Sequence, residues 1–535
     1  MTSRTPNSIS YYVEEDYNDV LTQLPTLINE AEKRAGEVLE PTIAEKMEIR
    51  GVIKDFIRSR KRKIYGGTAL NEAIKLVNPD DAFYNEYNFK DIEFYSTKPI
   101  LDAVDLCDIL YKKNYKYVKC REAQHEETYT IFVNFQLYCD ISYMPTRVFN
   151  GVKTITIDGI FYVHPHFALI DYLRMINQPL TAAASRWEKA FKRMYLLLKN
   201  YPLEYFDKKM IVSNSVKEID SYVMRIKKEF MADEDVRNTC MITGFAAYNF
   251  YIGHAVNSRT VEQQARNARE KNNMKNSLIA VPYLEFMSVN YYDTVERLYK
   301  FIKEIVDDPK GISLDEYYPL FQFTGYSVKI NYKGSPVAVV YQADGYCIPY
   351  IKTTVGYSYV SFQYLLMHLL IRKFESHLEQ NRDMYFTFGS LIGSLISARN
   401  LYLDTNNLGV INNSVFGEFR IPCIGSTMSY QRSSLIRNLE KFKRGKQMFS
   451  YDPDRFFSSK QEQQNKFDPA RARYKNTSGN KIYIAKNLAF GFDLDNNLIR
   501  ANDMEPDYSD TDSEDQSDSV TEDTNDSTDS TDSTN

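Results

Sequence analysis

The chain is poor in the residues that build metal sites and disulfide scaffolds. Its 535 residues include six cysteines, six histidines and one tryptophan. The cysteines are Cys107, Cys120, Cys139, Cys240, Cys347 and Cys423. They show no Cys-x-x-Cys spacing, which argues against structural zinc and predicts reduced thiols in a reducing compartment. A run of about 20 apolar residues and a basic-then-apolar leader are also absent, so we expect a soluble intracellular protein without a membrane span.

Two common nucleotide-binding signatures are missing as well. The stretch IYGGTALNEAI (residues 64–74) places two glycines before an amphipathic run, yet no Gly-Lys-Ser/Thr follows and the three-glycine Rossmann spacing is absent. The glycines would let the backbone approach a ligand, and the N-terminus of the following helix would offer amide donors to a phosphate. Such a turn is also ordinary strand-to-helix chemistry, so its ligand must be identified from the rest of the chain.

Charge is distributed unevenly along the chain. Residues 501–535 contain 13 of the 71 acidic residues and no lysine or arginine, which leaves 58 acidic and 66 basic residues in residues 1–500. The acidic tail is predicted to be disordered because it has little apolar surface to bury. It would act as a solubilising segment, a phosphoacceptor or a competitor for a basic groove. The basic body favours a nucleic-acid partner.

Three carboxylates form a candidate metal site. In NFKDIEFYS (residues 88–96), Asp91 and Glu93 alternate with apolar residues, so both should project from one face of a strand. Asp140 lies between apolar neighbours in the β-rich run at residues 128–145, where an unpaired charge would be costly. A D-x-E pair alone is usually an ordinary polar sheet face. Together, however, three such acids suit two Mg²⁺ or Mn²⁺ ions, which would activate a hydroxyl and neutralise a nucleoside triphosphate.

The order of glycine pair, D-x-E and third Asp resembles the polymerase-β-type nucleotidyltransferase superfamily. Over residues 60–200 the chain resembles the poly(A) polymerase catalytic subunits of large cytoplasmic DNA viruses, of the poxvirus and giant-virus kind. The resemblance implies an α/β (α+β) fold with a mixed sheet and helices. It also implies ATP as substrate, a single-stranded RNA 3′ end as acceptor, and a setting in the host cytoplasm, at a viral factory, or in the virion. Poxvirus relatives use a separate processivity partner.

The resemblance also assigns roles to residues. It implies that Gly66, Gly67 and Thr68 contact the triphosphate, together with Lys189 or Arg186 on the helix predicted at residues 184–200. Asp91, Glu93 and Asp140 would hold the metals, and Asp140 would help to deprotonate the 3′-hydroxyl. One departure is the long gap between Gly67 and Asp91. Asp80 and Asp81 lie in this gap and are rival acids, although their Asn-Pro-Asp-Asp setting favours a loop cap.

A faint internal repeat predicts a second, degenerate copy of this module. IYGGTALN is matched by ITGFAAYN (residues 242–249), DIEFYS by YLEFMS (283–288), CDISYMP by ADGYCIP (343–349) and GIFYV by GYSYV (356–360). In these matches Glu285 corresponds to Glu93 and Asp344 to Asp140, whereas Tyr283 replaces Asp91 and Phe245 replaces the second glycine. We expect the second copy to fold without catalysing, with a nucleotide cleft between the copies. The alternative is a second active site at Glu285 and Asp344.

Three basic regions are candidates for contact with nucleic acid. RSRKRK (residues 58–63) would be either solvated surface or an attractor of phosphates. The regions at 437–446 and 452–475 mix basic and aromatic residues, a pattern found in single-strand binding and also on ordinary helix surfaces. Trp187 is predicted to be core, and the His164-Pro-His166 turn is predicted to be structural.

The residues therefore predict nucleotidyl transfer with two metal ions, and the resemblance implies a template-independent poly(A) polymerase that acts on viral mRNA. Alternatives are a uridylyl- or tRNA-end transferase, a transferase that modifies protein or small molecules, and a non-catalytic RNA-binding processivity or scaffold protein. A homodimer would supply further RNA-binding surface. The predicted regions are a helical segment at 1–55, a catalytic domain at 56–200, a helical connector at 201–235, a degenerate domain at 236–400, a basic and aromatic region at 401–500 and an acidic tail at 501–535.

Overall fold

The fold was analysed in a computed structural model of the chain. The model describes residues 11–38, 41–84, 90–180, 185–204, 206, 217–257, 276–443, 449–454, 489–492 and 497–500. The predicted acidic tail and most of the region at 452–475 lie outside these residues. The described chain falls into two compact units, residues 1–486 and 487–535. The second unit contributes one antiparallel pair, β17 (Phe490–Phe492) with β18 (Leu498–Arg500).

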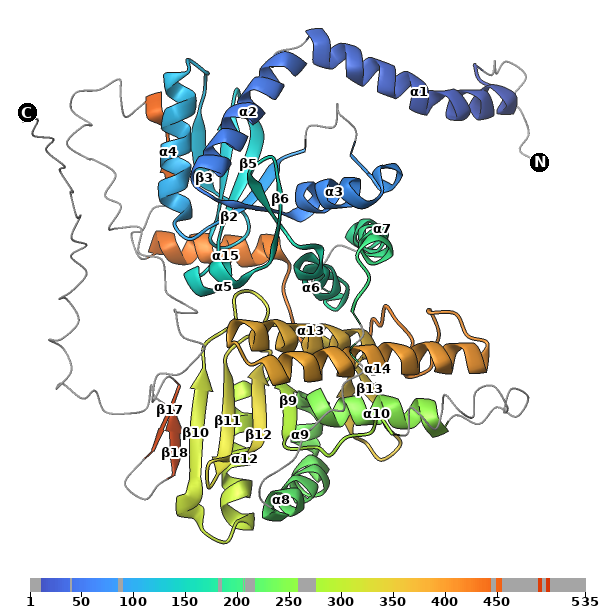
Figure 1. Cartoon of the computed structure of the whole chain (residues 1–535), viewed down its shortest axis with the longest axis vertical. Helices are drawn as coiled ribbons and strands as arrows, with labels where there is room; N and C mark the ends of the chain where they lie inside the picture. Colours follow the sequence, from blue (N-terminus) through green and yellow to red (C-terminus); the bar gives the residue numbers. More distant parts are fainter. Residues whose placement is uncertain are drawn as a thin grey trace, which may run out of the picture. The chain divides into compact units, whose positions relative to one another are not determined.

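The described part of the first module is built on an eight-stranded mixed sheet (Figure 1). In spatial order its strands are β16 (Ser450–Tyr451), β3 (Lys119–Glu122), β4 (Thr128–Val133), β5 (Gln136–Tyr143), β2 (Ile92–Ser96), β1 (Lys63–Tyr65), β7 (Ile160–Val163) and β6 (Thr154–Ile157). The central strands β2 and β5 are parallel, and β1 runs antiparallel to β2. This pairing brings the C-terminal end of β1 to the N-terminal end of β2, where the predicted site lies.

Amphipathic helices cover the sheet of the first module. Ile49, Ile53 and Ile57 of α2 are fully buried in one core with Leu106 and Leu110 of α4, so these two helices cover the same face. Helices α3, α6 and α7 pack against one another beside β1. The helical elements of this part are α1 (Glu14–Val38), α2 (Ile43–Ser59), α3 (Gly66–Val77), η1 (Pro79–Asp81), α4 (Pro99–Lys112), α5 (Thr146–Gly151), α6 (Pro165–Ile176) and α7 (Ser185–Asn200).

A second mixed sheet of eight described strands follows in the chain (Figure 1). Its spatial order is β10 (Ile312–Tyr317), β11 (Ser327–Tyr332), β12 (Ser335–Gln342), β9 (Leu284–Ser288), β8 (Cys240–Thr243), β14 (Ser358–Val360), β13 (Cys347–Lys352) and β15 (Cys423–Gly425). Its helical elements are α8 (Lys217–Lys228), η2 (Phe230–Ala232), α9 (Glu234–Thr239), α10 (Gly244–Asn257), α12 (Tyr291–Ile305), η3 (Pro309–Gly311), α13 (Phe362–Leu378) and α14 (Arg382–Asn406). Helix α15 (Tyr430–Lys443) lies instead beside the first sheet, where Lys441 pairs with Glu122 of β3 (Figure 1).

The two sheets share one topology, which confirms the predicted duplication. Seven strands correspond in spatial order, from β3 and β10 at one side to β6 and β13 at the other. The directions of the central pairs also agree, because β1/β2 and β8/β9 are antiparallel while β2/β5 and β9/β12 are parallel. Register matches as well: Glu93 pairs with Tyr65 in the first sheet, and Glu285 pairs with Thr243 in the second.

Contacts between the modules involve α6 and α13. Phe167 of α6 packs against the rings of Phe321, Phe323 and Phe374, with centroids 6.3, 5.0 and 5.2 Å away. Arg147 of α5 donates to the carbonyl of Leu378 at 2.9 Å. Aromatic burial and a hydrogen bond from a guanidinium therefore join the first module to the second. None of the helices in the described residues is both long and apolar enough to cross a membrane.

One disulfide contradicts the prediction that the thiols are reduced. Cys347 and Cys423 are bonded, with their Cα atoms 5.3 Å apart, although 76 residues separate them in sequence. The antiparallel pairing of β13 with β15 brings the two residues together, and the spacing of the cysteines gave no sign of it. The other four cysteines are free and buried.

We expect Gly244→Ala to destabilise the protein by about 3 kcal/mol, because Gly244 has φ of +58° and a Cβ atom there would lie 1.6 Å from Glu285 Oε2. Thermal and urea denaturation would measure this loss. Gly253→Ala in the same helix is the matched control, since nothing lies within 4 Å of its Cβ position. A control that is as unstable as Gly244→Ala would contradict the prediction.

Candidate active site

A glycine turn begins helix α3 directly after strand β1. Gly66 has φ of +70°, a conformation that favours glycine. A Cβ atom at Gly66 would lie 1.8 Å from Oε2 of Glu93, and the amide of Gly67 donates to this same oxygen at 3.3 Å. The turn therefore lets the backbone approach a carboxylate of the protein itself. This carboxylate caps the N-terminus of α3, where Tyr65 makes no side-chain cap.

The three predicted carboxylates lie at one end of the first sheet. Glu93 on β2 is directly opposite Asp140 on β5, and Asp91 comes immediately before β2. Ile92 and Phe94, which alternate with the acids, are fully buried. The period-2 pattern thus places Asp91 and Glu93 on the face opposite the core, as the sequence predicted.

The carboxylates influence one another through their charges. Burial and then the charge of Asp91 raise the pKa of Glu93 to about 7, while the Gly67 amide opposes the shift. Burial also raises the pKa of Asp140, and the charge of Asp91 adds to it, against a hydrogen bond donated by Thr130 Oγ1 at 2.6 Å. An added cation would relieve this repulsion.

The donor set suits a hard divalent cation, but the side chains do not converge on one. All three groups offer oxygen ligands, which Mg²⁺ and Mn²⁺ prefer. Glu93 instead accepts from Gly67, and Asp140 accepts from Thr130. Within the described residues, no three His, Cys, Asp or Glu side chains form a group that could hold an ion. Metal binding would require Glu93 and Asp140 to exchange these hydrogen bonds for ligation.

Two cations of α7 face the glycine turn. The Arg193 guanidinium lies 2.9 Å from the Cβ position of Gly67 and donates to the hydroxyl of Tyr84. Lys189 lies one helical turn earlier. Burial and the nearby Arg193 lower the pKa of Lys189, while the charges of Glu93 and Asp91 raise it, which places its ammonium near the carboxylates. Positive charge therefore borders the N-terminus of α3.

The structure places the two residues predicted to contact triphosphate in different surroundings, and it brings Arg193 to the glycine turn. Lys189 lies at the site, whereas Arg186 lies near His125, whose pKa its charge lowers after the larger effect of burial. Arg193 was not singled out by the sequence analysis, although its spacing of four residues from Lys189 places both on one helix face. Thr68 follows the turn, and its hydroxyl donates to the carbonyl of Asp91 at 3.4 Å.

The rival acids near the site have structural partners. Asn78 caps the short helix η1 by accepting from the amide of Asp80 at 3.3 Å. Asp81 pairs with Lys199 at 2.7 Å and accepts from Asn200, so it fixes this loop to α7. His164 likewise caps α6 by accepting from the amide of His166, as predicted for a structural turn.

The basic run at residues 58–63 is also used structurally. Arg62 forms a bidentate pair with the buried Asp102, at 2.6 and 2.9 Å. Lys63 is buried in β1 and donates to the carbonyls of Phe149 and Val152. Burial lowers the pKa of Lys63 to about 8. These two cations therefore stabilise the first module and do not point to phosphate.

Matching residues of the two modules make matching contacts. The Asn71 side chain accepts from the amides of Phe83 and Tyr84, both at 2.9 Å, and holds the loop that follows α3. Asn249 exchanges hydrogen bonds with the backbone of Ile279 at 2.7 and 3.1 Å and holds the corresponding loop. The Asn of the I-x-G-x-x-A-x-N repeat therefore has a structural role in both copies.

The match of Asp344 with Asp140 is wrong. Register places Val339, not Asp344, opposite Glu285. Asp344 follows β12 and accepts from the amide of Tyr291 at 3.1 Å, at the N-terminus of α12. The sequence match was misleading because Asp344 and Asp140 have similar neighbours in sequence, although Asp344 caps a helix and does not lie on a strand. The second module thus keeps only the glutamate of the three acids.

Both carboxylate oxygens of Glu285 have hydrogen-bond partners. Its two oxygens accept from the Phe245 amide and from the Tyr341 hydroxyl, each at 3.1 Å, and His368 Nε2 is 3.5 Å away. Burial alone would raise the pKa of Glu285, but His368, Arg372 and the Phe245 amide together lower it. With Tyr283 in place of an acid and no carboxylate opposite, this site offers no metal chemistry and acts as structural core.

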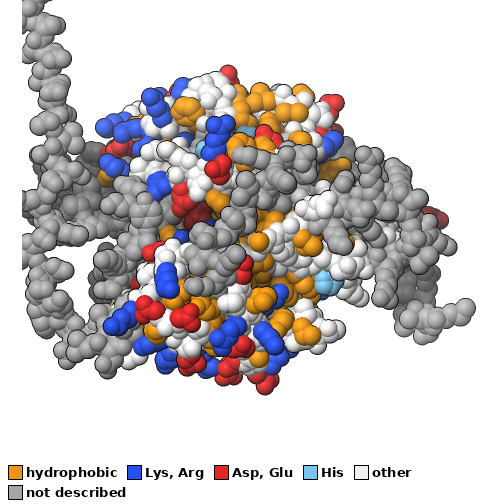
Figure 2. Space-filling view, turned by 60° about the horizontal axis from the view of Figure 1, so that its bottom comes forward, with side chains coloured by type: hydrophobic (Ala, Val, Ile, Leu, Met, Phe, Trp, Pro, Cys, Tyr) orange, Lys and Arg blue, Asp and Glu red, His pale blue; other side chains and the backbone are white. Residues whose placement is uncertain are grey.

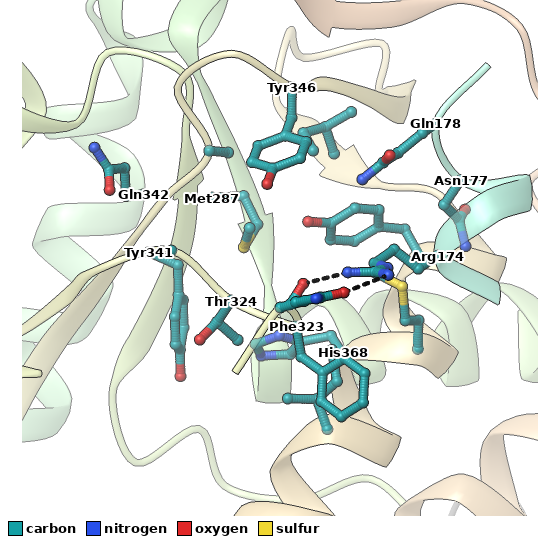
Figure 3. Close-up of a pocket in the computed structure, with 17 residues that line it drawn as sticks. Arg174, Asn177, Gln178, Met287, Phe323, Thr324, Tyr341, Gln342, Tyr346 and His368 are labelled. Atoms are coloured by element: carbon teal, nitrogen blue, oxygen red, sulfur yellow. Dashed lines mark hydrogen bonds between the residues drawn. The ribbon is translucent and has the colours of Figure 1, made fainter. Parts of the chain in front are cut away.

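A small pocket lies between α6 and the second module (Figure 3). Arg174 reaches across it and donates to the backbone and side-chain oxygens of Gln322 at 2.6 and 3.3 Å, while Tyr341 and His368 form part of its wall. Its volume of 40 Å³ has room for a few water molecules. It lies away from the three carboxylates, and the predicted nucleotide cleft between the copies stays a prediction.

Sequence comparisons place both halves of the chain among viral proteins. A family model described as "Poly(A) polymerase catalytic subunit" matches residues 51–182, and one described as "APMV, Putative poly(A) polymerase, catalytic subunit, C-terminal" matches residues 217–492. The "Putative poly(A) polymerase catalytic subunit" of Acanthamoeba polyphaga mimivirus is 55% identical over 502 residues, which cover 91% of this chain and 86% of that protein.

A more distant relative and a solved structure agree with these sequence matches. The protein of the same name from African swine fever virus (strain Badajoz 1971 Vero-adapted) is 30% identical over 202 residues, 37% of this chain and 39% of that protein. The crystal structure of the Megavirus polyadenylate synthase matches with a TM-score of 0.86 and 54% identity, covering 93% of this chain and 98% of the other. The chain therefore belongs to the family of viral poly(A) polymerase catalytic subunits.

Proposed function

We propose that the chain is a polynucleotide adenylyltransferase that adds AMP from ATP to RNA 3′ ends without a template. The observation that carries this proposal is the placement of Glu93 opposite Asp140, with Asp91 beside them, at the N-terminus of α3. Viral poly(A) polymerases among the relatives support the reaction and the nucleotide. The viral origin of those relatives supports viral mRNA, in the cytoplasm of an infected cell, as the acceptor.

Asp91, Glu93 and Asp140 would hold two divalent cations, Mg²⁺ or Mn²⁺. When bound, such ions lower the pKa of the attacking 3′-hydroxyl and neutralise the charge on the triphosphate. Because the pKa of Glu93 is about 7, this carboxyl would release a proton near neutral pH before it could act as a ligand. Asp140, directly opposite, would help to take the proton of the 3′-hydroxyl.

The N-terminus of α3 and two side chains of α7 would bind the triphosphate. Gly67 and Thr68 offer backbone amides at the positive end of the helix dipole. Arg193 presents a planar guanidinium over this turn, and Lys189 adds a second positive charge. In the ligand-free protein Glu93 accepts from the Gly67 amide, so an incoming phosphate oxygen would replace Glu93 there and release it toward the metals.

We expect Asp91→Asn to reduce AMP incorporation by about 100-fold or more, because the variant removes a charged oxygen ligand without changing shape. The assay extends a labelled oligoribonucleotide with Mg²⁺ or Mn²⁺ and one of ATP, UTP, CTP or GTP. A gel shift checks that the variant still binds RNA. Full activity of the variant would contradict the metal role, and extension with UTP instead of ATP would favour a uridylyltransferase.

Arg193→Ala should raise the KM for ATP by about tenfold, since it removes a charge-assisted contact to phosphate. Arg186→Ala, on the same helix but near His125, should change that KM by less than about twofold. Steady-state extension of a saturating primer would measure both values. Equal effects of the two substitutions would remove Arg193 from the triphosphate site.

A homodimer is supported by the exposed apolar side of α1. Its large apolar side chains recur every three or four residues, which forms one stripe along the 25-residue helix. They are 38–60% exposed, and they are Tyr17, Val20, Leu21, Leu24, Leu27 and Ile28. An unpartnered stripe of this length is typical of a helix that pairs with another, and a second copy of α1 would cover it.

Light scattering should therefore give twice the chain mass of 62.4 kDa for the wild type. Leu21→Glu with Leu24→Glu should lower the mass to that of one chain, because the charges fall on the stripe. Thr22→Glu with Thr26→Glu adds the same charge on another side of the helix and should leave the dimer intact. A wild type that scatters as one chain would refute the homodimer and favour a separate processivity partner.

A further inference from the structure

Two exposed aromatic rings stack at the tip of the β4–β5 hairpin. The rings of Tyr117 and Phe135 have centroids 4.4 Å apart and planes inclined by 30°. Their side chains are nonetheless 60% and 77% exposed. The amide of Asn134 donates to the carbonyl of Lys116 at 3.0 Å and ties the hairpin to the turn that follows α4. The pair is thus a fixed aromatic surface in solvent.

The backbone that holds these rings outward is strained. Tyr117, Asn134 and Phe135 have φ of +50°, +48° and +63°, in the left-handed region that bulky residues seldom adopt. Such conformations persist where the surrounding structure imposes them, and they concentrate at functional sites. Positive φ at both Asn134 and Phe135 is the geometry that a two-residue hairpin turn requires. What the turn does not require is a bulky ring at the second position, which usually holds glycine, or its contact with a second exposed ring. The exposed pair is therefore the feature that needs an explanation.

Exposed lysines surround the pair. The chain from the end of α4 to β3, YKKNYKYVKC, carries Lys112, Lys113, Lys116 and Lys119, and all four are exposed. Two acids of α2 reach this region and have partners there: Glu45 accepts from Asn134 at 2.9 Å, and Glu48 lies beside Tyr115. Asp108 of α4 lies close enough to Lys112 to feel its charge. We call Tyr117, Phe135 and these four lysines the hairpin patch. On the face drawn in Figure 2, charges of both signs are interspersed.

Strand register places the hairpin patch beyond the catalytic end of the sheet. Ile92, the first residue of β2, pairs with Cys139, so Asp91 lies level with Tyr138 and the start of β5 extends past it. Phe135 precedes Asp140 by five residues, or about 17 Å along an antiparallel strand. Stacked nucleotides rise about 3.4 Å each, so this distance corresponds to about five nucleotides.

We propose that the hairpin patch binds the RNA strand about five nucleotides upstream of the 3′ end that reacts at Asp140. The Tyr117–Phe135 pair would stack on an unpaired base, and the lysines would contact the backbone phosphates. Stacking combined with a basic track binds single strands without reading sequence, which suits a growing homopolymer. The inference rests on the proposed function, because it takes Asp140 as the position of the 3′ end.

The test compares long and short RNA primers, and it uses the full-length protein. Anisotropy of labelled oligo(A) measures binding, and extension of the same primers measures catalysis. Tyr117→Ala with Phe135→Ala should weaken binding of a 12-nucleotide oligo(A) by about tenfold. It should leave the extension rate of a saturating trinucleotide, which is too short to reach the hairpin patch, within about twofold of the wild type.

A charge variant supplies the second arm of the test. Lys112→Glu with Lys116→Glu should weaken the 12-nucleotide complex and reduce the dependence of its affinity on salt. Lys228→Glu with Lys300→Glu makes the same change in net charge at two exposed positions of the second module, and it should leave binding unchanged. This control separates a local track from a general charge effect.

Three outcomes would overturn the proposal. Unchanged binding of the long oligonucleotide by the aromatic variant would do so, as would equal losses with the short and long primers. A change in molecular mass by light scattering would mean that the hairpin patch contacts another protein chain instead. If the wild type extends no primer at all, the proposed function fails, while the binding measurements still decide whether the hairpin patch holds RNA.

Discussion

The structure depends on a glutamate that contacts a glycine at the start of a helix; this glutamate is half-buried in the first module and fully buried in the second. In both modules the glycine has positive φ, and its missing Cβ leaves room for the carboxylate, at Gly66 with Glu93 and at Gly244 with Glu285. The carboxylate then accepts from the next amide of the helix. This contact fixes strand, turn and helix relative to one another. It is a constraint on the fold, and in the first module it also positions Glu93 opposite Asp140 in the candidate active site.

The two modules differ in the partners of this glutamate and in the direction of its pKa shift. Glu285 has further partners in Tyr341 and His368, and its pKa is lowered. Glu93 faces two other acids, and its pKa is raised to about 7. The first arrangement is stable without a ligand, whereas the second is electrostatically unsatisfied. Like charges left close together lower stability, and such arrangements are concentrated at functional sites.

Much of this could be predicted from sequence, because the determinants are local. The glycine pair, the alternation around Asp91 and Glu93, and an acid within an apolar strand are all short-range patterns, and the repeat revealed the duplication. Arg193, the disulfide and the true partner of Glu285 depend on which distant segments become neighbours. The Asp344 match failed for this reason: strand register, rather than similarity of letters, determines which residue faces Glu285.

The locked glutamate of the second module also has an evolutionary consequence. Restoring an aspartate at Tyr283 alone would not recreate a metal site, because Val339 lies where the third acid would be needed and Glu285 is already fully coordinated by hydrogen bonds. Each single reversion would bury a charge without a cation to balance it. No single substitution at Tyr283 or Val339 would therefore give the second copy a metal site, which confines this half of the duplicated chain to an architectural role.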